Sequence, residues 1–293
     1  MAVSSATTTK EREQQEKKVS VEFFHIDMIP DAMRNMGWEM APKLMEHWFS
    51  ISPAYSFDKE SKTALLKCDA RNIPHSKISD NIVKMAWANQ YPQVRDGIEK
   101  LKATWNTQNA RKELRKHIDN MNISEGESAA IGFSDDVKEL DAIAQVNYLI
   151  IGSKLDTIND WYGAIGNGNL KVCVRGYVSL LEGKYRVAIK SLGFYIKDTY
   201  DFLDDDKFGI DLPESLGVWG KERILNKAET ISYMSSYGAG TFGLLVKMFS
   251  GFVPVFNSDF RKWQRKHNAG GDYIVFSDIM WVPPLEKDYL VTI

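Results

Sequence analysis

The sequence predicts an α+β protein, with a helical N-terminal half packed on a mainly antiparallel β-sheet or open barrel in the C-terminal half. Up to about residue 140, apolar residues recur at three- and four-residue steps, which is the period of a helix. From residue 141, segments rich in Val, Ile, Tyr and Phe alternate in hydrophobicity at period two, as strands do. We therefore divide the chain into a flexible polar leader (1–20), a helical region (21–140) and a β-rich region (141–293).

The leader, MAVSSATTTKEREQQEKKVS, holds no apolar run of the length that a secretory signal needs. We expect a protein that is cytoplasmic in the cell that makes it, or one that leaves by a route without a cleavable signal. The formal net charge of −2 gives no overall attraction for nucleic acid, so no nucleic-acid partner is expected. Cys68 and Cys173 lack metal-ligand spacing and are expected to be reduced, buried thiols.

Three segments of the helical region carry the helical pattern. The first, AMRNMGWEMAPKLMEHWF, forms one apolar stripe from Met33 to Trp48. The second, ISDNIVKMAWA, continues the pattern with Ser79 as a plausible cap. The third, from Gly97 to Met121, is strongly charged, and acidic residues interrupt its basic run RKELRKH. We interpret that run as a solvated face rather than a phosphate site.

Four segments of the β-rich region predict strands: AIAQVNYLIIGSKL, NLKVCVRGYVSLL, KYRVAIKSLGFYI and DYIVFSDIMWVP. Glu182-Gly183 is a short turn between the second and the third, so residues 169–197 predict a β-hairpin. The parity of the apolar residues changes within the third segment, and a bulge near 191–193 would keep them on one face. Asp198 would then point with this apolar face, whereas Tyr195 and Lys197 would point away.

The third segment runs into FYIKDTYDFLDDDKFG, at 194–209. A carboxylate at the inner end of a strand is costly to bury unless it is paired, hydrogen-bonded or bound to a cation. Asp198 and Asp201 could share Mg²⁺ or Ca²⁺, or hold one proton between them as acid and base, with Tyr200 as a phenol donor. The ordinary alternative is that both aspartates cap a turn. We interpret the run 204–206 as solvated loop charges.

A second polar group lies in NSDFRKWQRKHNAGGDYIVFSD, at 257–278. Arg261 and Arg265 are four residues apart and share a helix face, and His267 follows them. The arginines could clamp a phosphate, because guanidinium groups present paired donors, or they could form salt bridges with Asp198 and Asp201. Both interpretations stay open. A turn-capping role is expected for Asp272, which follows a double glycine.

The segment GAGTFGLLVKMFSGFVPVF, from Gly238 to Phe256, carries Lys247 as its one charge. Its four glycines and one proline make it a poor free helix, so we expect a buried segment, with a shallow membrane-contacting loop as the alternative. The chain has no GxSxG, HExxH, Walker or GxGxxG motif, which argues against the serine hydrolases, zinc proteases, NTPases and dehydrogenases that carry them.

Four motifs, in the order IPDAMRNMGWEMAPKLMEHWF, LGFYIKDTYDF, SLGVWG and FRKWQRKHNAGGDYIVFSD, resemble a family of uncharacterised bacterial proteins encoded near type VI secretion genes. The resemblance spans roughly residues 29–278. It implies an antibacterial effector with a secretion-apparatus partner and an immunity protein, delivered to the periplasm of a target cell.

The hairpin and DTYDF are also similar to the catalytic segment of colicin M-type bacteriocins, which degrade lipid II at its pyrophosphate link and need a divalent cation. That motif is D-x-Y-D followed by five residues and His-Arg. Asp198, Tyr200 and Asp201 match its first part, whereas Lys207 and Phe208 stand where His-Arg would be.

Together the resemblances imply a metal-assisted pyrophosphate hydrolase that acts on a lipid-linked cell-wall precursor. Its catalytic residues would be Asp198, Tyr200, Asp201 and His267; Arg261 and Arg265 would bind substrate, and Asp198 and Asp201 would hold Mg²⁺ or Ca²⁺. One alternative is a non-enzymatic adaptor or accessory protein that binds a secreted partner. Another is a membrane-disrupting toxin, which rests on residues 238–256 and includes peripheral membrane contact.

Overall fold

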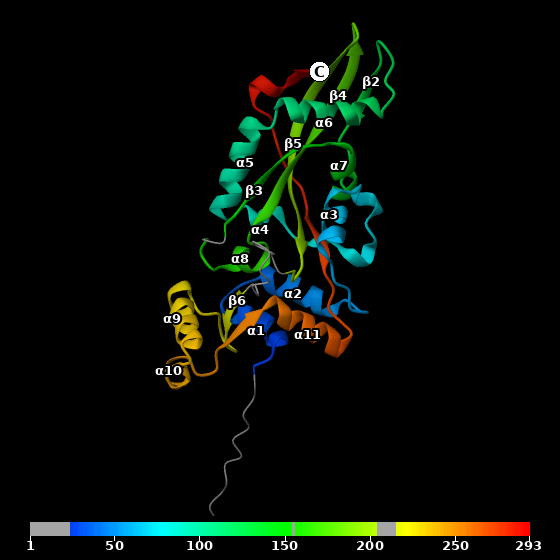
Figure 1. The fold of residues 1–293 in the computed structure, drawn as a ribbon. Helices are drawn as coiled ribbons and strands as arrows, with labels where there is room; N and C mark the ends of the chain where they lie inside the picture. Colours follow the sequence, from blue (N-terminus) through cyan, green and yellow to red (C-terminus); the bar gives the residue numbers. More distant parts are fainter. Residues whose placement is uncertain (1–23, 154–155, 204–214) are drawn as a thin grey trace, which may run out of the picture.

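An eight-stranded sheet forms the centre of the protein in the computed structural model, which describes residues 24–153, 156–203 and 215–293 (Figure 1). The strand order is β1-β8-β5-β4-β2, with β3 paired to β4, and β9 and β10 paired to β5. The strands are β1 (Ile78–Val83), β2 (Ser128–Ile131), β3 (Gln145–Ile151), β4 (Gly168–Leu181), β5 (Lys184–Tyr200), β8 (Tyr273–Ser277), β9 (Met280–Val282) and β10 (Leu290–Thr292). In these ranges β1 is parallel to β8 and the other pairs are antiparallel, which confirms the predicted fold class.

Helices cover the sheet and close one of its ends (Figure 1). The α-helices are α1 (Ile29–Asn35), α2 (Met40–Ser50), α3 (Lys59–Lys67), α4 (Met85–Ala88), α5 (Pro92–Thr104), α6 (Gln108–Asp119), α7 (Val137–Ile143), α8 (Asp160–Ala164), α9 (Lys227–Gly238), α10 (Phe242–Met248) and α11 (Asn257–His267). Four short 3-10 helices are η1 (Ile26–Met28), η2 (Ala70–Asn72), η3 (His75–Lys77) and η4 (Glu286–Asp288). Helices α5 and α6 pack on β3, whereas α1, α2 and α11 gather at the opposite end of the molecule.

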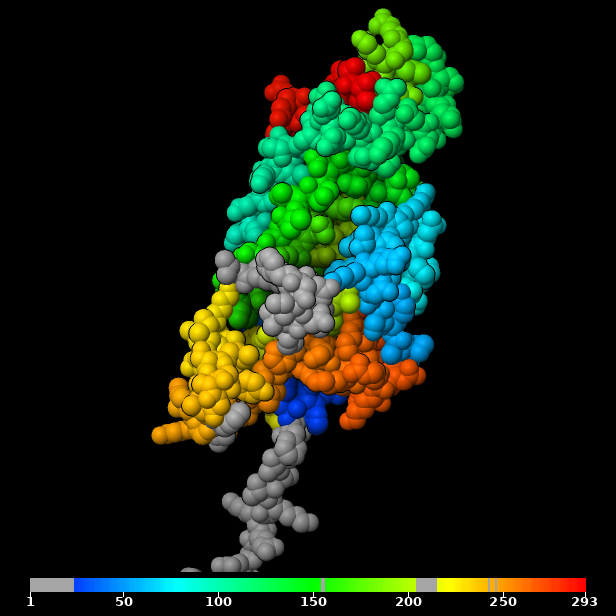
Figure 2. Space-filling model, in the orientation of Figure 1, coloured from blue at the N-terminus to red at the C-terminus, as the bar shows by residue number. Residues whose placement is uncertain are grey.

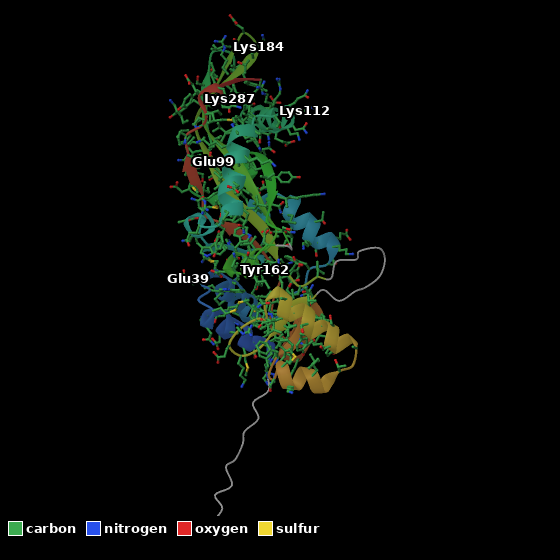
Figure 3. All side chains as sticks on the ribbon, turned by 90° about the vertical axis from the view of Figure 1, so that its left-hand side faces the viewer. Glu39, Glu99, Lys112, Tyr162, Lys184 and Lys287 are labelled. Carbon is green, nitrogen blue, oxygen red and sulfur yellow. The ribbon has the colours of Figure 1, made fainter. Side chains whose placement is uncertain are left out.

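The predicted hairpin is confirmed as β4 and β5, which pair from Leu181–Lys184 at the turn to Asn169–Lys197. Glu182 and Gly183 form the turn with φ angles of 54° and 69°. Two positive φ values in succession are typical of a two-residue hairpin turn whose twist matches that of its strands. Lys184 lies at the tip of this hairpin, far from the end of the sheet where Tyr162 lies (Figure 3).

A bulge in β5 aligns its two apolar sets, as the change of parity predicts. Arg175 pairs with Ser191 and Gly176 with Ile189, so Lys190 is the extra residue, one position before the expected range. Residues on both sides of the bulge therefore share a face of the sheet. After it, Leu192, Phe194 and Ile196 are fully buried, and Asp198 continues in the same phase.

The apolar stripe from Met33 to Trp48 forms two helices instead of one. Gly37, with φ of 77°, separates α1 from α2 in the left-handed region that favours glycine. The start of α2 is capped from a distant element: the Asp160 carboxylate accepts hydrogen bonds from the backbone N–H of Glu39, Met40 and Ala41. It also accepts one from Trp87 Nε1, at 3.0 Å, so one buried carboxylate joins α2, α4 and α8.

The prediction of a helix at ISDNIVKMAWA is wrong, because Ile78–Val83 form strand β1 and α4 contains only Met85–Ala88. Pairing with β8 in the sheet outweighs the helical spacing of the segment. The charged segment 97–121 is also divided, with Thr107 capping α6 through a bond from the Ala110 N–H. The basic run lies on α6, where Lys112, Arg115 and Lys116 are exposed, in agreement with a solvated face.

Residues 215–256 form a small unit beside the main body, which we call the α9–α10 module. It combines α9 and α10 with a two-stranded sheet of β6 (Ser215–Trp219) and β7 (Val253–Phe256). Its own apolar cluster contains Val218, Leu225, Tyr233 and Leu245. The prediction of a buried segment at 238–256 is wrong, because Leu244, Met248 and Val253 are exposed by 46%, 56% and 37%. No helix in the described ranges has the length and apolar character to cross a membrane.

Both cysteines are free thiols, as expected. Cys173 is buried in the sheet, where burial raises the pKa of its thiol to about 12, and Cys68 is part-buried. Neither cysteine therefore forms a disulfide bond, and the packed core stabilises the fold.

Replacing the buried cap tests how far the fold depends on Asp160. Asp160→Ala leaves several buried N–H donors without an acceptor, so we expect the free energy of unfolding in urea to fall by roughly 3 kcal/mol or more. Asp58→Ala is the matched control, because Asp58 caps α3 at an exposed position and should cost about 1 kcal/mol. Equal losses in the two variants would contradict the role assigned to Asp160.

Candidate functional site

A cavity of about 430 Å³ lies where β5 ends, between the sheet and the helices that close it. Apolar and aromatic side chains form most of its wall, among them Met33, Trp38, Met45, Tyr162, Phe202, Trp219 and Phe260. Its polar residues include Lys62, Asn167, Asp198, Thr199, Asp201 and Asn257. A mainly apolar cavity with a few polar groups is the usual form of a small-molecule site.

Asp198 reaches this cavity because the bulge places it in phase with the buried face of β5. Its Oδ1 accepts a hydrogen bond of 2.9 Å from the Thr199 N–H, and its Oδ2 lies against Gly168, where an added Cβ would be 3.3 Å away. The pKa of Asp198 is raised to about 7, because burial and, to a smaller extent, the nearby Asp201 charge outweigh the lowering effects of the Thr199 hydrogen bond and Lys62. The carboxyl therefore exchanges its proton near neutral pH.

Asp201 lines the same cavity in a different electrostatic environment. Its Oδ2 lies 2.8 Å from Lys62 Nζ on α3, and its Oδ1 accepts a hydrogen bond from the Leu203 N–H. The Asp201 side chain is only 6% exposed, so its charge is balanced mainly by this ion pair. Two carboxyls in one cavity, one paired with a cation and the other with a raised pKa, are arranged for different roles.

Tyr200 lines the same cavity as the two aspartates, and its predicted role as a phenol donor to them stays a prediction. Its ring stacks on Tyr273, with centroids 5.4 Å apart, and meets Phe202 edge to face. Burial raises the pKa of the Tyr200 phenol, so the group keeps its proton over the physiological range. The structure thus brings Asp198, Tyr200 and Asp201 together at one cavity.

Arg261 pairs with Asp272 instead of Asp198 or Asp201. Its Nη1 and Nη2 donate to Asp272 Oδ1 and Oδ2 at 2.9 and 2.7 Å. Asp272 is fully buried and also accepts hydrogen bonds from Trp48 Nε1 and the Phe57 N–H. Of the two interpretations left open, the salt bridge with Asp198 and Asp201 is therefore wrong for Arg261, and Asp272 is an ion-pair centre rather than only a turn cap.

Arg265 and His267 lie away from the cavity. Both are exposed on the last turns of α11, and the His267 ring stacks on Trp263 with centroids 4.4 Å apart. His267 lines a second hollow of about 500 Å³, shared with Phe24 and Val253. The structure therefore separates these two residues from Asp198 and Asp201.

The polar residues of the cavity that sequence reasoning missed include Lys62 and Asn257. Lys62 comes from a helix far from the hairpin in sequence, and no local pattern marks it. Asn257 begins α11, donates from Nδ2 to the Leu203 carbonyl at 2.9 Å, and has a buried Oδ1 with no hydrogen-bond partner in the described part of the chain. Such an unpaired acceptor in a cavity wall was detectable only from the structure.

The opposite face of β5 holds a second group of charges that the sequence did not reveal. Tyr195 and Lys197 point away from the Asp198 face, as expected, but both are buried and bind Asp141. Lys171 of β4 binds the same carboxylate. Within the described ranges, no three His, Cys, Asp or Glu side chains are grouped to hold a metal ion. Residues 204–208, with the run of aspartates and Lys207-Phe208, lie outside those ranges.

Residues 24–293 match a family of unknown function, DUF6402. The chain belongs to the DUF6402 family. No curated protein and no solved structure matches it. The match confirms the coarser part of the expected resemblance, a family without assigned function, and the DUF6402 region contains both the cavity and the α9–α10 module.

Two arginines of α11 provide a matched test of the ion-pair centre. Arg261→Ala leaves the buried Asp272 carboxylate without its cation, so we expect the free energy of unfolding to fall by about 3 to 5 kcal/mol. Arg265→Ala, one helical turn away and exposed, should change it by no more than about 0.5 kcal/mol. Chemical denaturation of both proteins measures the difference, and a small effect of both substitutions would contradict the pairing.

The raised pKa of Asp198 predicts a pH-dependent stability. Between the ordinary value of 3.8 and about 7, the folded protein holds this proton and the unfolded chain does not, so the stability that Asp198 contributes is lost as pH rises through this window. The Asp198→Asn variant has no carboxyl to titrate at this position, so it does not lose this stability as pH rises. From about pH 5 to about pH 8 we expect this variant to gain roughly 1 to 4 kcal/mol relative to the wild type.

Urea unfolding at the two pH values measures this gain. Asp119→Asn, at an exposed position that ends α6, is the control. Its free energy of unfolding should differ from that of the wild type by the same amount at both pH values. A difference between Asp198→Asn and the wild type that does not change with pH would contradict the assigned proton uptake.

Proposed function

We propose that the cavity is the active site of a hydrolase in which Asp198 moves a proton. The observation that carries this proposal is a carboxyl at the cavity wall whose pKa is raised to about 7 by burial. A group that titrates near the working pH is best suited to accept and return protons during a reaction. Clusters of perturbed titratable groups in a cavity are typical of active sites.

In its ionised form Asp198 can take a proton from a water molecule that attacks the substrate, and in its protonated form it can donate one to a leaving group. Lys62 is the cation of the described cavity wall, and its contact with Asp201 holds it at the site. A fixed positive charge stabilises negative charge that develops on the substrate as the bond breaks. Tyr200, which keeps its proton, supports the position of this end of β5 through its ring contacts.

The narrower proposal is an antibacterial effector that cleaves the pyrophosphate link of lipid II or a related lipid-linked precursor. The similarity of Asp198, Tyr200 and Asp201 to the D-x-Y-D motif supports it, and the apolar part of the cavity wall suits a substrate with a lipid chain. Association with type VI secretion, delivery to the periplasm of a target cell, and secretion-apparatus and immunity partners are further parts of this proposal.

A bound Mg²⁺ or Ca²⁺ is part of this proposal, and the oxygen donors of the cavity wall support it. Asp198 and Asp201 supply carboxylate oxygens, and Asn257 adds an amide oxygen without a hydrogen-bond donor among the described residues. Hard divalent cations prefer such oxygen ligands, and a bound cation would polarise the phosphoryl oxygens of the substrate. Because Lys62 occupies one side of Asp201, its ammonium would have to move if both carboxylates held the metal.

The non-enzymatic alternative, an adaptor that binds a secreted partner, is favoured by one observation. Arg261 and Asp272, two of the polar residues considered from sequence, form an internal ion pair instead of part of an open site. Asp198 and Asp201 do line a cavity, which favours the enzyme.

Hydrolysis of purified lipid II in the presence of Mg²⁺ tests the proposal. We expect the wild type to release undecaprenol-type product and Asp198→Asn to reduce kcat/KM by about 100-fold or more. Below about pH 7 the wild-type kcat/KM should fall with Asp198 as the base, and a chelator should reduce turnover.

Asp119→Asn, on the exposed end of α6, is the control and should keep wild-type activity. If the wild type gives no product at any pH or with either cation, and Asp198→Asn is as toxic as the wild type in the periplasm, the hydrolase assignment is wrong. Retained partner binding by Asp198→Asn under those conditions would support the adaptor.

A further inference from the structure

The α9–α10 module exposes an unusual amount of apolar surface. Of the twelve large apolar side chains that are exposed in the described ranges, five lie in this module: Ile231, Tyr237, Leu244, Met248 and Val253. Ile231 and Met248 are exposed by 68% and 56%. Figure 2 shows α9 and α10 at an outer corner of the molecule, so this surface projects away from the main body. Several exposed apolar side chains in one projecting unit indicate an interaction site.

The charges of the module are distributed unlike those of the rest of the chain. Residues 215–256 carry four Lys or Arg and two Glu, a net charge of 4 − 2 = +2, so the remainder carries −2 − 2 = −4. Both acidic residues lie near the start of α9: Glu229 pairs with Arg223, and Glu222 accepts a hydrogen bond from Asn35. From Thr230 to Phe256 the sequence has a single charge, Lys247, next to the exposed Met248.

We propose that the α9–α10 module docks on the surface of a lipid bilayer that contains anionic phospholipids. Exposed Leu, Ile and Met side chains can enter the boundary between headgroups and acyl chains, where the ring of a Tyr is also favourable. Lys247, beside them and without an acidic residue in the same stretch, meets the negative surface potential. The helices are too short to cross a bilayer, so the module lies on it.

The main body provides a firm attachment for the module. Trp219 of β6 meets Trp38 edge to face, with centroids 6.2 Å apart, and Asn35 of α1 bonds to Glu222. The surface contacts are therefore made at the outer side of the module, while its inner side packs on the body. This proposal does not depend on the hydrolase activity, because none of its exposed apolar residues lines the Asp198 cavity.

Co-sedimentation of the full chain with vesicles tests the proposal. We expect binding to vesicles of phosphatidylglycerol and phosphatidylcholine and much weaker binding to phosphatidylcholine alone. The double variant Leu244→Glu/Met248→Glu should reduce the partition coefficient by about tenfold or more, because two side chains that would enter the bilayer become charged. Lys247→Glu should reduce binding to anionic vesicles by about fivefold and leave binding to neutral vesicles unchanged.

The matched control is Tyr148→Glu/Ile150→Glu, at two side chains of β3 that are exposed by 57% and 65% on another part of the molecule. It should bind anionic vesicles as the wild type does, and so should Asp198→Asn, which separates lipid docking from catalysis. Circular dichroism and thermal melting verify that each variant is folded.

Two results would overturn the proposal. The first is a wild-type protein that stays in solution with both kinds of vesicle, or a Leu244→Glu/Met248→Glu variant that binds as well as the wild type. The second is self-association of the wild type, measured by analytical ultracentrifugation, that this variant abolishes while neither protein binds vesicles. That outcome would assign the apolar surface to contact between two copies of the chain.

Discussion

The structure depends on β5, a strand that is paired along both edges. One edge pairs with β4 from Lys184 to Lys197, and the other pairs in turn with β10, β9 and β8. Because successive side chains of a strand face opposite sides, a shift of one residue exchanges its two faces. The extra residue Lys190 shifts the register of β5 by one position, so it determines which face of the sheet each later residue of β5 occupies.

The end of β5 places opposite charges on opposite sides of the sheet. Lys197 enters one side, where the Asp141 carboxylate lies 2.7 Å away, and Asp198 enters the other. Lys197 forms an ion pair with a buried carboxylate, whereas burial raises the pKa of Asp198, which has no adjacent cation of its own. The alternation of side chains along β5 thus places the Lys197–Asp141 ion pair on one face of the sheet and the Asp198 carboxyl on the other.

Local patterns predicted the hairpin, its turn, the bulge to within one residue and the direction of Asp198, because each depends on neighbours along the chain. Contacts between distant segments could not be predicted in this way. β1 has helical spacing but joins the sheet through β8, and Lys62 reaches Asp201 from α3. Arg261 and Asp272 occur in one short stretch of sequence, yet their pairing requires the turn after α11, where Asn268 is left-handed with φ of 49°.

Trp219 belongs to the α9–α10 module and also lines the cavity that contains Asp198. One side of it packs on Trp38, and together they form part of the wall of the cavity that contains Asp198. The module and the cavity therefore share a wall, so a displacement of the module relative to α1 would change the volume of the cavity. Leu216 and Ile224 of the module line the cavity as well, so the shared wall does not consist of Trp219 alone.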